Sequence, residues 1–596
     1  MRREDLFDSY ERELLYLRRA GAGFSRAFPK VAGRLALGPD VAGDPHVERL
    51  IESFAFLTAR LQLDLDRQFP ILTEALLGVL HPHLLAPVPS ASIARFRVDP
   101  SAGQLTDGYQ LARGTPLVAL AGQDVRCRFR TTMPLTLWPL EVERTLSQSV
   151  DATPFRDGSA AAVLRIDLSG GGQPLDGLPI RRLRLFINAE PTVASAVYEA
   201  LTSTVLGTAF VTADGSHCRL AGAGAVGPGS FADEDSLFPY PANGHPAYRL
   251  LQEYFAFPQK FLFIDIDIPA GALVGPRPSI LVALSRPLPS RLHLRPGTLV
   301  TGCVPVVNLF PVICEPIRLD HRSTAYPVQP DAMRERISEI HEITAVAGLD
   351  GDGRRIPYVR LFSVDHALAG DTPAAFWHAT RQPSLREDVG GTDHWLSLYN
   401  DRFEPARPAS ETLMVSALCS NRGLAEELPA GLALSLEDQA PAAAISLLLK
   451  PTPPRYRSIA GESAWKLVSQ MSLNHLSLSS GPQALAALQE ILALHALDDP
   501  ASRAQVRALR HLEVRPAVQR IGKDAWRGFC RGLEVSLEID EGGFVGASPL
   551  VFGEVLSRFF AMYASINTFT QLQFRSPHRG GTWKSWPCTL GSQFAL

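Results

Sequence analysis

The stretch that decides the fold is residues 71–98, ILTEALLGVLHPHLLAPVPSASIARFRV, within which the spacing of apolar residues changes. From Ile71 to Leu80 the apolar residues follow helical spacing, and Pro82 must end that helix because its ring cannot continue it. From Ile93 to Val98 apolar and polar residues alternate, as they do in a half-buried strand. The chain is therefore expected to pass from a helical region to a β-rich region near residue 90.

Upstream of this change, the sequence predicts amphipathic helices. The first has apolar residues three and four positions apart, which places them on one face: Leu6, Tyr10, Leu14 and Leu17. The second begins at Asp44–Pro45, an N-cap residue followed by proline at the first helical position, and a third runs from Ile71 to Leu80. The second has apolar residues on one face and charged residues opposite: Val47, Leu50, Ile51, Phe54, Leu57, Leu61 and Leu65 against Glu48, Glu52, Arg60 and Asp66. A helix this amphipathic is expected to pack against a partner.

Downstream, alternating apolar residues predict strands. Val163–Leu168 and Phe261–Ile268 alternate in this way, and Ser169–Gly172 is a turn signal between strands. No regular alternation of strands with helices appears, so antiparallel sheets in sandwich-like modules are expected. Residues 371–401 are rich in polar and turn residues and predict a domain boundary or a long loop.

The last part of the chain mixes both patterns. After a proline-rich break at 451–454, helices are predicted at Trp465–Met471 and Pro482–Leu492, and a strand at Leu533–Ile539. Ser548–Pro549 begins a further helix, and a strand near Gln571–Phe574 follows it. The apolar face of that helix consists of Phe552, Val555, Leu556, Phe559 and Tyr563.

Together these patterns predict an α+β multidomain chain. The expected parts are an N-terminal helical region (1–89), a β-rich, antiparallel sandwich-like middle (90–330), a second β-rich or irregular domain (331–455) and a mixed α/β C-terminal domain (456–596). The 596 residues are 46% hydrophobic and 20% charged, so each part can bury a core of its own.

The composition argues against several classes of protein. The net charge of -3 gives no support for nucleic-acid binding, which usually requires a strongly basic face. The seven cysteines are odd in number and lack C-x-x-C spacing, so neither a disulfide framework nor structural zinc is expected. The N-terminus lacks an apolar signal region, and the longest apolar stretch, Val300–Cys314, is too short to span a bilayer. A soluble, cytoplasmic protein is therefore expected.

Motifs that suggest chemistry lack the context that the chemistry needs. Gly222–Gly227 fits G-x-G-x-x-G, but Pro228–Gly229 and no helical pattern follow, so a flexible loop is favoured over a dinucleotide site. Asp350–Gly353 resembles the start of a calcium loop, yet the twelfth position is Leu361 where glutamate is needed, which favours a surface turn. His81–His83 ends a helix without a third metal ligand nearby.

Catalytic signatures are also missing from the sequence. It contains no G-x-S-x-G elbow, phosphate-binding loop or H-E-x-x-H motif. His475 lies among alternating leucines, which favours a hydrogen-bonded core histidine over a catalytic one. A Cys–His pair assembled by the fold stays open, because such partners need only be close in space. The alternatives are a metal-dependent hydrolase, a free-standing ligand-binding β-sandwich protein, or a structural subunit.

Several stretches, in order along the whole chain, resemble one family. The most specific is YRLLQEYFAFP (248–258), followed by Lys260–Phe261. The others are YEREL (10–14), residues 44–60, LHPH (80–83) with Ala86–Pro87, CVPVVNLF (303–310), CSNR (419–422), residues 473–478, CRGLE (530–534) and YASINTF (563–569). Together they resemble the type VI secretion baseplate subunit TssF, also called ImpG or VasA. Ser420 stands where the family pattern has threonine, a conservative departure.

The resemblance implies a structural role with no reaction, cofactor or metal. Proteins of this family resemble phage baseplate wedge proteins, and two TssF copies join one TssG. TssK then attaches the wedge to the membrane complex, TssE links it to the contractile sheath, and wedges close around a VgrG hub. The resemblance therefore implies a location at the cytoplasmic face of the inner membrane, without membrane insertion or nucleic-acid binding. A second copy of the chain is a further candidate partner.

Two helical faces are the candidate partner surfaces. Tyr10, Leu14, Leu50 and Phe54 lie on the N-terminal helices, which are expected to pack into an inter-subunit bundle. On the C-terminal helix the candidates are Phe559, Phe560 and Tyr563, aromatic residues of the kind enriched in interface hot spots. The competing interpretation is that these faces pack into the chain's own core, as most apolar helix faces do.

Overall fold

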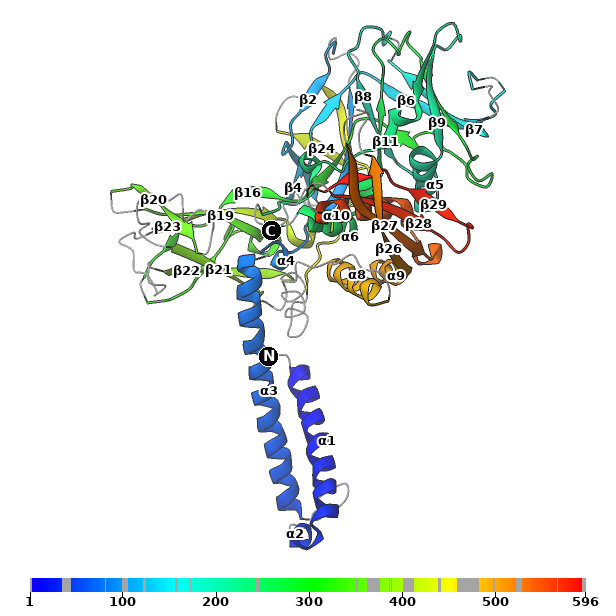
Figure 1. Cartoon of the computed structure of the whole chain (residues 1–596). Helices are drawn as coiled ribbons and strands as arrows, with labels where there is room; N and C mark the ends of the chain where they lie inside the picture. The colour runs from blue at the N-terminus through cyan, green and yellow to red at the C-terminus, as the bar shows by residue number, and fades with distance from the viewer. Residues whose placement is uncertain are drawn as a thin grey trace. The chain divides into compact units, whose positions relative to one another are not determined.

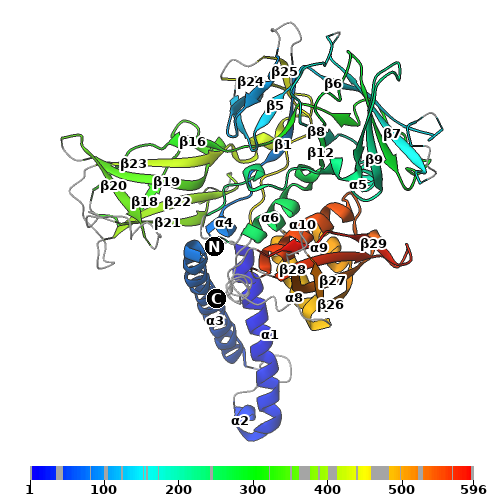
Figure 2. The ribbon, with the colours of Figure 1, turned by 45° about the horizontal axis from the view of Figure 1, so that its top comes forward.

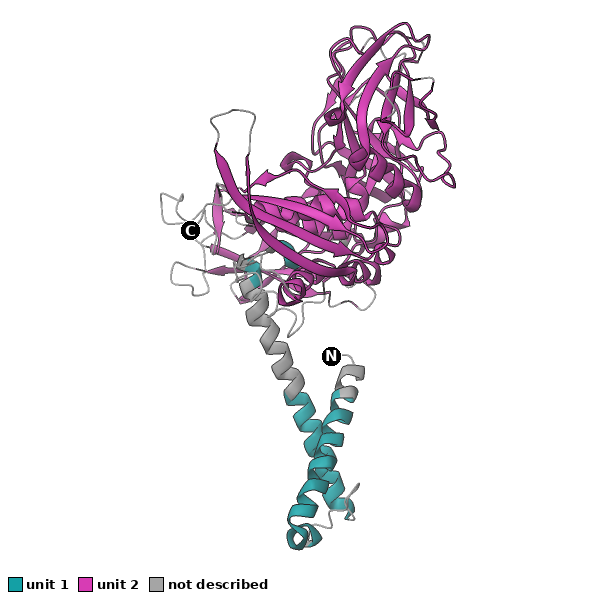
Figure 3. Cartoon of the chain, turned by 45° about the vertical axis from the view of Figure 1, so that its right-hand side comes forward, with its two compact units in different colours: residues 1–85, 458–474 teal, residues 86–457, 475–596 magenta. Residues whose placement is uncertain are grey.

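The computed structural model describes most of the 596 residues. The described ranges are 3–34, 44–80, 82–98, 105–121, 125–151, 153–155, 159–171, 173–241, 244, 246–320, 322–349, 352–361, 376–384, 386, 389–399, 412–437, 441–457, 482–496, 499–520, 528–564, 566 and 568–591. The chain forms two compact units (Figure 3). Unit 1 contains residues 1–85 with 458–474, and unit 2 contains residues 86–457 with 475–596. The boundary between the two units at residues 85 and 86 lies close to the change of pattern predicted near residue 90.

The described part of unit 1 is helical. Its helices are α1 (Arg3–Ala27), α2 (Pro29–Arg34), α3 (Pro45–Leu80) and α4 (Pro82–Leu85). Asp44 caps α3 as expected, because its Oδ1 accepts a hydrogen bond from the backbone N–H of His46 at 2.9 Å. The helix also ends at Leu80, before Pro82, as predicted.

The separate helix predicted from Ile71 to Leu80 was wrong. Helix α3 runs without a break through Pro70, so the expected second and third helices are one element of 36 residues. A proline inside a helix removes one backbone hydrogen bond and can bend the helix without ending it. The sequence supplies no glycine or cap next to Pro70 that would stop the helix there.

Six strands of unit 2 close into a small antiparallel barrel (Figure 2). In order around the barrel they are β1 (Ala91–Val98), β15 (Cys303–Val307), β4 (Val125–Thr131), β3 (Pro116–Ala121), β24 (Ala433–Leu436) and β25 (Ala442–Leu447). In β1, Ala94 lies opposite Val304 on one side and Leu447 on the other. Strands far apart in sequence therefore share one core.

A backbone contact inside this barrel requires glycine. Gly302 has a φ of 70°, and a Cβ atom there would overlap the carbonyl oxygen of Phe96. The core itself contains Phe96, Phe129 and Val304, all nearly inaccessible to solvent, and it continues to Phe186 and Phe263 of the neighbouring sheet.

Two further antiparallel sheets follow the barrel strands. The five-stranded sheet has the order β10 (Cys218–Gly222), β9 (Val205–Val211), β13 (Ser279–Leu284), β7 (Ala162–Ser169), β6 (Glu141–Gln148). The four-stranded sheet has the order β11 (Val226–Pro228), β12 (Phe263–Asp267), β8 (Arg182–Ile187), β14 (Leu299–Val300). A separate two-stranded sheet pairs β2 (Tyr109–Leu111) with β5 (Leu135–Leu137). The predicted strands at Val163–Leu168 and Phe261–Ile268 correspond to β7 and β12.

An eight-stranded sheet occupies most of residues 310–420. Its path is β16 (Phe310–Ile313), β23 (Thr412–Ser420), β19 (Glu339–Leu349), β20 (Arg355–Arg360), β21 (Phe376–Pro383), β22 (Thr392–Tyr399) and β18 (Tyr326–Val328), with β17 (Ile317–Arg318) beside β23. Strands β21 and β22 pair antiparallel within the stretch 371–401, where the sequence predicted a loop or boundary. That prediction was wrong because cross-strand packing of Trp377, Leu396 and Leu398 outweighs the local polar composition.

The C-terminal part combines helices with a five-stranded sheet. Its elements are α8 (Pro482–His495), α9 (Pro500–Arg507), β26 (Leu509–Arg520), β27 (Phe529–Ile539), α10 (Pro549–Tyr563), β28 (Thr568–Arg575), β29 (Thr582–Ser585) and β30 (Thr589–Leu590). Strands β27 and β28 are parallel, and α10 connects them, as a parallel crossover requires. The predicted strands and helices at 482–492, 533–539, 549–563 and 571–574 are confirmed, and Trp465–Met471 lies outside the described residues.

Helix α6 (Pro246–Ala256) is buried on all sides in unit 2, and it contains most of the stretch 248–258 on which the family resemblance chiefly rests. The Tyr254 ring lies 5.2 Å from the Phe552 ring of α10, and the Tyr254 hydroxyl donates to Gln505 of α9. The short 3-10 helix η3 (Pro258–Phe261) follows and supplies Lys260, which donates to Glu253 with both side chains fully buried. Helix α6 therefore joins the C-terminal elements to the β-rich part.

The boundary expected between residues 330 and 331 is crossed by strand pairing. Strands β24 and β25, beyond residue 331, close the barrel that β1 begins. Strand β16, before residue 330, pairs with β23 of the eight-stranded sheet. Local periodicity predicts where a strand lies but carries no information about which distant strand pairs with it.

Candidate partner interface

Helices α1 and α3 pack antiparallel, and two contacts establish which faces meet. The Arg18 guanidinium donates from Nε and Nη2 to Oε1 of Glu48, at 3.0 and 2.6 Å. The ring of Tyr10 lies edge-on to the ring of Phe56, with centroids 6.5 Å apart. Since later residues of α1 face earlier residues of α3, the helices run in opposite directions, as Figure 1 shows.

The seam between these helices is built from small residues. Among the side chains described in residues 7–33 and 44–61, the buried ones are all small: Ser9, Ala22, Ala55 and Ala59 in α1 and α3, and Ala32 in α2. Small side chains let two helices approach closely but bury little apolar area. The seam therefore leaves most of the large apolar side chains of both helices outside.

The most apolar stripe of α3 faces away from α1. Four residues of α3 form this stripe, which we call the outer stripe: Leu50, Phe54, Leu57 and Leu61. They are spaced four, three and four positions apart in the sequence. These side chains are 69%, 61%, 53% and 55% exposed, in that order. Their spacing places them on one helix face, opposite the face that carries Glu48 and Ala55. Helices in bundles pack through apolar residues that are spaced alternately four and three positions apart.

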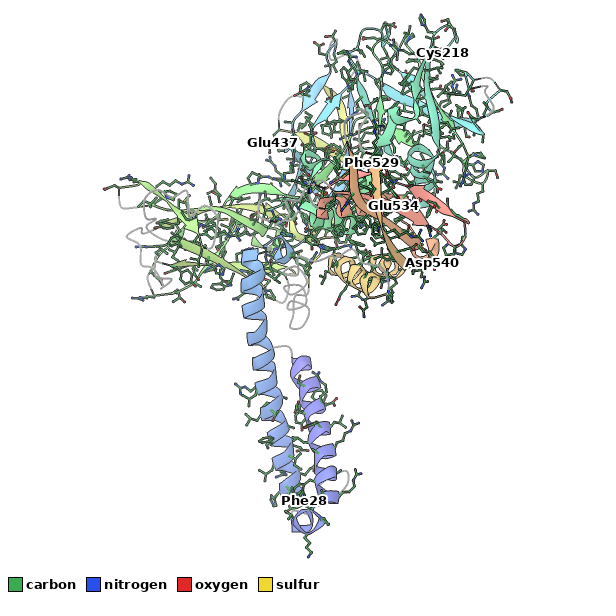
Figure 4. The ribbon with its side chains drawn as sticks, viewed as in Figure 1. Phe28, Cys218, Glu437, Phe529, Glu534 and Asp540 are labelled. Carbon is green, nitrogen blue, oxygen red and sulfur yellow. The ribbon has the colours of Figure 1, made fainter. Side chains whose placement is uncertain are left out.

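Helix α1 and the following turn add further exposed apolar side chains. They are Phe7, Leu15, Tyr16, Phe24, Phe28 and Val31, between 40% and 67% exposed. The rings of Phe24 and Phe28 lie 5.2 Å apart near α2, where Figure 4 labels Phe28. Single exposed apolar residues are normal on soluble proteins, so these side chains, which lie on several sides of α1 and the following turn, define no surface of their own.

The four candidate residues of the N-terminal helices separate into two groups. Tyr10 and Leu14 are half-buried, and the Tyr10 ring contacts Phe56 of α3, so Tyr10 helps to hold the two helices together. Leu50 and Phe54 belong to the outer stripe and are open to a partner. The candidates omitted Leu57 and Leu61, although their helical spacing from Leu50 and Phe54 was visible in the sequence.

On the C-terminal helix the structure places the candidates differently. Phe559 and Phe560 are 0% and 1% exposed, and the Phe559 ring lies 6.0 Å from the ring of Tyr248 in α6. They therefore pack in the chain's own core, where a partner cannot reach them. Tyr563 is the last residue of α10, and its side chain lies outside the described side chains. Helical periodicity cannot distinguish a face that a distant element of the same chain covers from one left for a partner.

The motifs that suggested chemistry are structural where they are described. Gly222 ends β10, a short 3-10 turn follows, and β11 comes next, so the helix that a dinucleotide fingerprint needs is replaced by a strand. Across the described residues no group of three or more His, Cys, Asp or Glu side chains is placed to hold a metal ion. His81, Asp350 and residues 473–478 lie outside the described residues.

Buried ionisable groups in unit 2 are held neutral or paired. Burial raises the pKa of the Cys127 and Cys303 thiols to about 12, so both remain protonated and unreactive at neutral pH. Burial, followed by the charges of Arg381 and Arg130, lowers the pKa of His341 to about 3. Glu339 accepts hydrogen bonds from Thr392 and from the Tyr456 hydroxyl at 2.8 Å. These groups stabilise the sheet and form no open catalytic arrangement.

No helix in the described portion of the chain has the length and apolar content needed to cross a membrane. The apolar face of the helical hairpin is the candidate partner surface.

Comparison with known proteins identifies the family. The family model described as "Type VI secretion system, TssF" matches residues 2–593. The chain belongs to the TssF family. It is 35% identical over 617 residues to "Type VI secretion system component TssF1" of Pseudomonas aeruginosa (strain PAO1), covering 99% of each chain. TssF is a subunit of the type VI secretion baseplate, and the family and function expected from the sequence are confirmed.

Two solved structures resemble the fold. One comes from "the type VI secretion system TssK-TssF-TssG baseplate subcomplex", with a TM-score of 0.71, 26% identity, and coverage of 92% of this chain and 100% of the other. The other comes from "the baseplate complex from the type VI secretion system", with a TM-score of 0.61, 27% identity, and coverage of 99% and 100%. The mixed, β-rich architecture of this TssF chain is therefore shared across almost its whole length.

Proposed function

We propose that this TssF chain is a structural wedge subunit whose α1–α3 hairpin joins it to helices of neighbouring baseplate subunits. The partners are TssG and TssK, the proteins named with TssF in the similar solved subcomplex. The role requires rigid docking surfaces and no catalytic residue. Against the metal-dependent hydrolase, no three His, Cys, Asp or Glu side chains among the described residues are placed to hold a metal ion.

One observation carries this proposal: the outer stripe is exposed although it is the most apolar face of α3. Fully burying a leucine or phenylalanine contributes about 1.5–3 kcal/mol, so covering four half-exposed side chains is worth on the order of 5 kcal/mol. An apolar stripe at spacings of four, three and four residues fits one further helix lying along α3. A helix from another subunit would supply that cover, in the manner of an inter-subunit bundle.

The family resemblance extends the proposal to the rest of the wedge. Two copies of the chain would join one TssG, TssE would link the wedge to the sheath, and six wedges would surround the VgrG hub at the cytoplasmic face of the inner membrane. Because two identical copies would then meet different neighbours, their loops or domain angles would differ. Superposing the two copies in a wedge structure and finding them identical would refute that last point.

The test is co-purification of the full chain with TssG and TssK, followed by mass measurement of the intact complex. We expect a stable complex with two copies of the chain per TssG. A chain that remains a monomer in the presence of both partners would contradict the proposal. The same purification with the outer stripe made polar shows whether the hairpin is responsible.

A further inference from the structure

A cavity of about 340 Å³ lies in unit 2, between the barrel and the eight-stranded sheet. Strand β4 supplies one wall with Arg126 and Arg128, and strand β16 supplies the other with Phe310 and Ile313. The turn before the 3-10 helix η4 (Glu335–Ile337) adds Arg334. The cavity is remote in sequence from the α1–α3 hairpin and is not used by the proposed bundle.

The alternation of strand β4 sends its arginines into this cavity. Cys127 and Phe129 are 0% and 1% exposed and face the barrel core, so Arg126 and Arg128 face outward. The side-chain oxygen of Asn421 accepts from the backbone N–H of Arg128 at 2.9 Å and from the side chain of Asn308 at 2.8 Å.

The arginines that line the cavity outnumber the acidic residues that line it. Asp331 accepts from the backbone N–H of Met333 at 2.9 Å and lies 3.9 Å from Arg334, and Glu315 accepts from the backbone of Ala332. For Arg126 and Arg128 the described residues provide no carboxylate within ion-pair distance. The Arg128 guanidinium lies over the Phe310 ring, 5.5 Å from its centroid. Two arginines are therefore presented to the cavity without an acidic partner from the described chain.

An apolar wall adjoins these charges. Ile313 lines the cavity and is 69% exposed, although its backbone pairs with Ser416 of β23. A small inorganic anion would pair with the arginines but leave this wall in contact with water.

We propose that this cavity binds an acidic segment of a partner protein, with carboxylates on Arg126 and Arg128 and an apolar side chain on Ile313. Arginine pairs with carboxylates through a planar fork of donors, and the exposed isoleucine supplies the apolar half of the site. This surface is a second docking site, distinct from the outer stripe. Since the test below uses the isolated full chain, its result does not depend on the bundle.

The experiment measures peptide binding by fluorescence anisotropy. The probe is a labelled peptide of about ten residues in which aspartate and glutamate alternate with leucine and phenylalanine. A control peptide of the same sequence, the amide twin, has asparagine and glutamine in place of aspartate and glutamate. We expect the acidic probe to bind the full chain, and the combined R126Q and R128Q substitutions to weaken it by about tenfold or more. I313S should weaken it separately, and R291Q, at an exposed arginine elsewhere in unit 2, should leave it unchanged.

Three results would overturn the proposal. The amide twin could bind as tightly as the acidic probe, or R126Q with R128Q could leave binding intact while thermal unfolding shows a folded chain. Inorganic phosphate could displace the probe where chloride of equal ionic strength does not, which would assign the cavity to small anions. Because Ile313, Arg126 and Arg291 are exposed, their substitution is not expected to disturb folding.

Discussion

Arg18 donates two hydrogen bonds to a single carboxylate oxygen of Glu48, and this contact turns the charged side of α3 toward α1. The two side chains are 33% and 13% exposed, so the pair itself contributes only about 1 kcal/mol. The pair matters more for which face of α3 meets α1 than for the stability it contributes. With Glu48, Ala55 and Ala59 in the seam, the leucines and phenylalanine of the outer stripe must face outward. The hairpin therefore resembles part of a helical bundle more than a finished two-helix domain.

Making the outer stripe polar should abolish partner binding without unfolding the chain. We expect L50Q combined with F54Q to weaken co-purification with TssG by tenfold or more, because apolar cover is lost. Glutamine keeps helix propensity, and both positions are exposed, so stability should change by less than about 0.5 kcal/mol. The matched control is L220Q, at a leucine 62% exposed on β10 of unit 2. Unchanged recovery of TssG with the double variant would refute the assignment of this face.

The buried pair of Lys260 and Glu253 should be far more sensitive than a surface lysine. K260M leaves the Glu253 carboxylate buried without its cation and should destabilise unit 2 by about 3–5 kcal/mol in urea unfolding. The combination K260M with E253Q should recover much of this loss, because the neutral amide still accepts from the backbone N–H of Leu237. K450M, at an exposed lysine, serves as the control. Equal losses for the single and double variants would show that the pair is not the cause.

The same glycine-to-alanine change should have opposite effects in two helices. In α10, a methyl group at Gly553 would overlap Trp586 and come within 2.7 Å of Phe574. Overpacking of about 1–3 kcal/mol exceeds the helix-propensity gain, so G553A should be destabilising by about 1–2 kcal/mol. In α1, a methyl group at Gly23 meets nothing within 4 Å, so G23A should stabilise the helix by roughly 0.5–1 kcal/mol. Urea unfolding followed by tryptophan fluorescence tests the first, and amide exchange in α1 tests the second. A stabilising G553A would contradict the tight packing of α10 on β28.

The stability of unit 2 should fall as the pH drops below 6.5. Burial holds the pKa of His341 at about 3, whereas the unfolded histidine titrates near 6.5. Between these values the unfolded chain binds a proton that the folded chain does not, so unfolding is favoured by up to about 1.4 kcal/mol per pH unit. His394, whose pKa burial also lowers, acts in the same direction. Urea unfolding at pH 7.5, 6 and 5 should show a smaller pH dependence in H341Q than in H217Q, an exposed control. Equal slopes would exclude His341 as a source of the effect.

Much of the local structure follows from the sequence. The Asp44–Pro45 cap signal predicted the start of α3, and the spacing of apolar residues predicted the change to strands after Pro82 and strands β1, β7, β12 and β27. Capping residues and strand alternation act within a few residues, so they are visible in any short window. The ordered set of family-like stretches likewise predicted membership of the TssF family, and the match over residues 2–593 confirms it.

The sequence alone thus determined which residues form apolar faces, and the tertiary structure decided which of those faces are covered. Phe54 and Phe559 both lie on strong apolar helix faces. Yet Phe559 is covered by α6, and Phe54 is left exposed because α1 occupies the opposite side of α3. The closure of the barrel by β24 and β25, and the cavity beside Arg126, also depend on distant segments meeting. Burial is a property of pairs of elements, and no periodicity within one element specifies its partner.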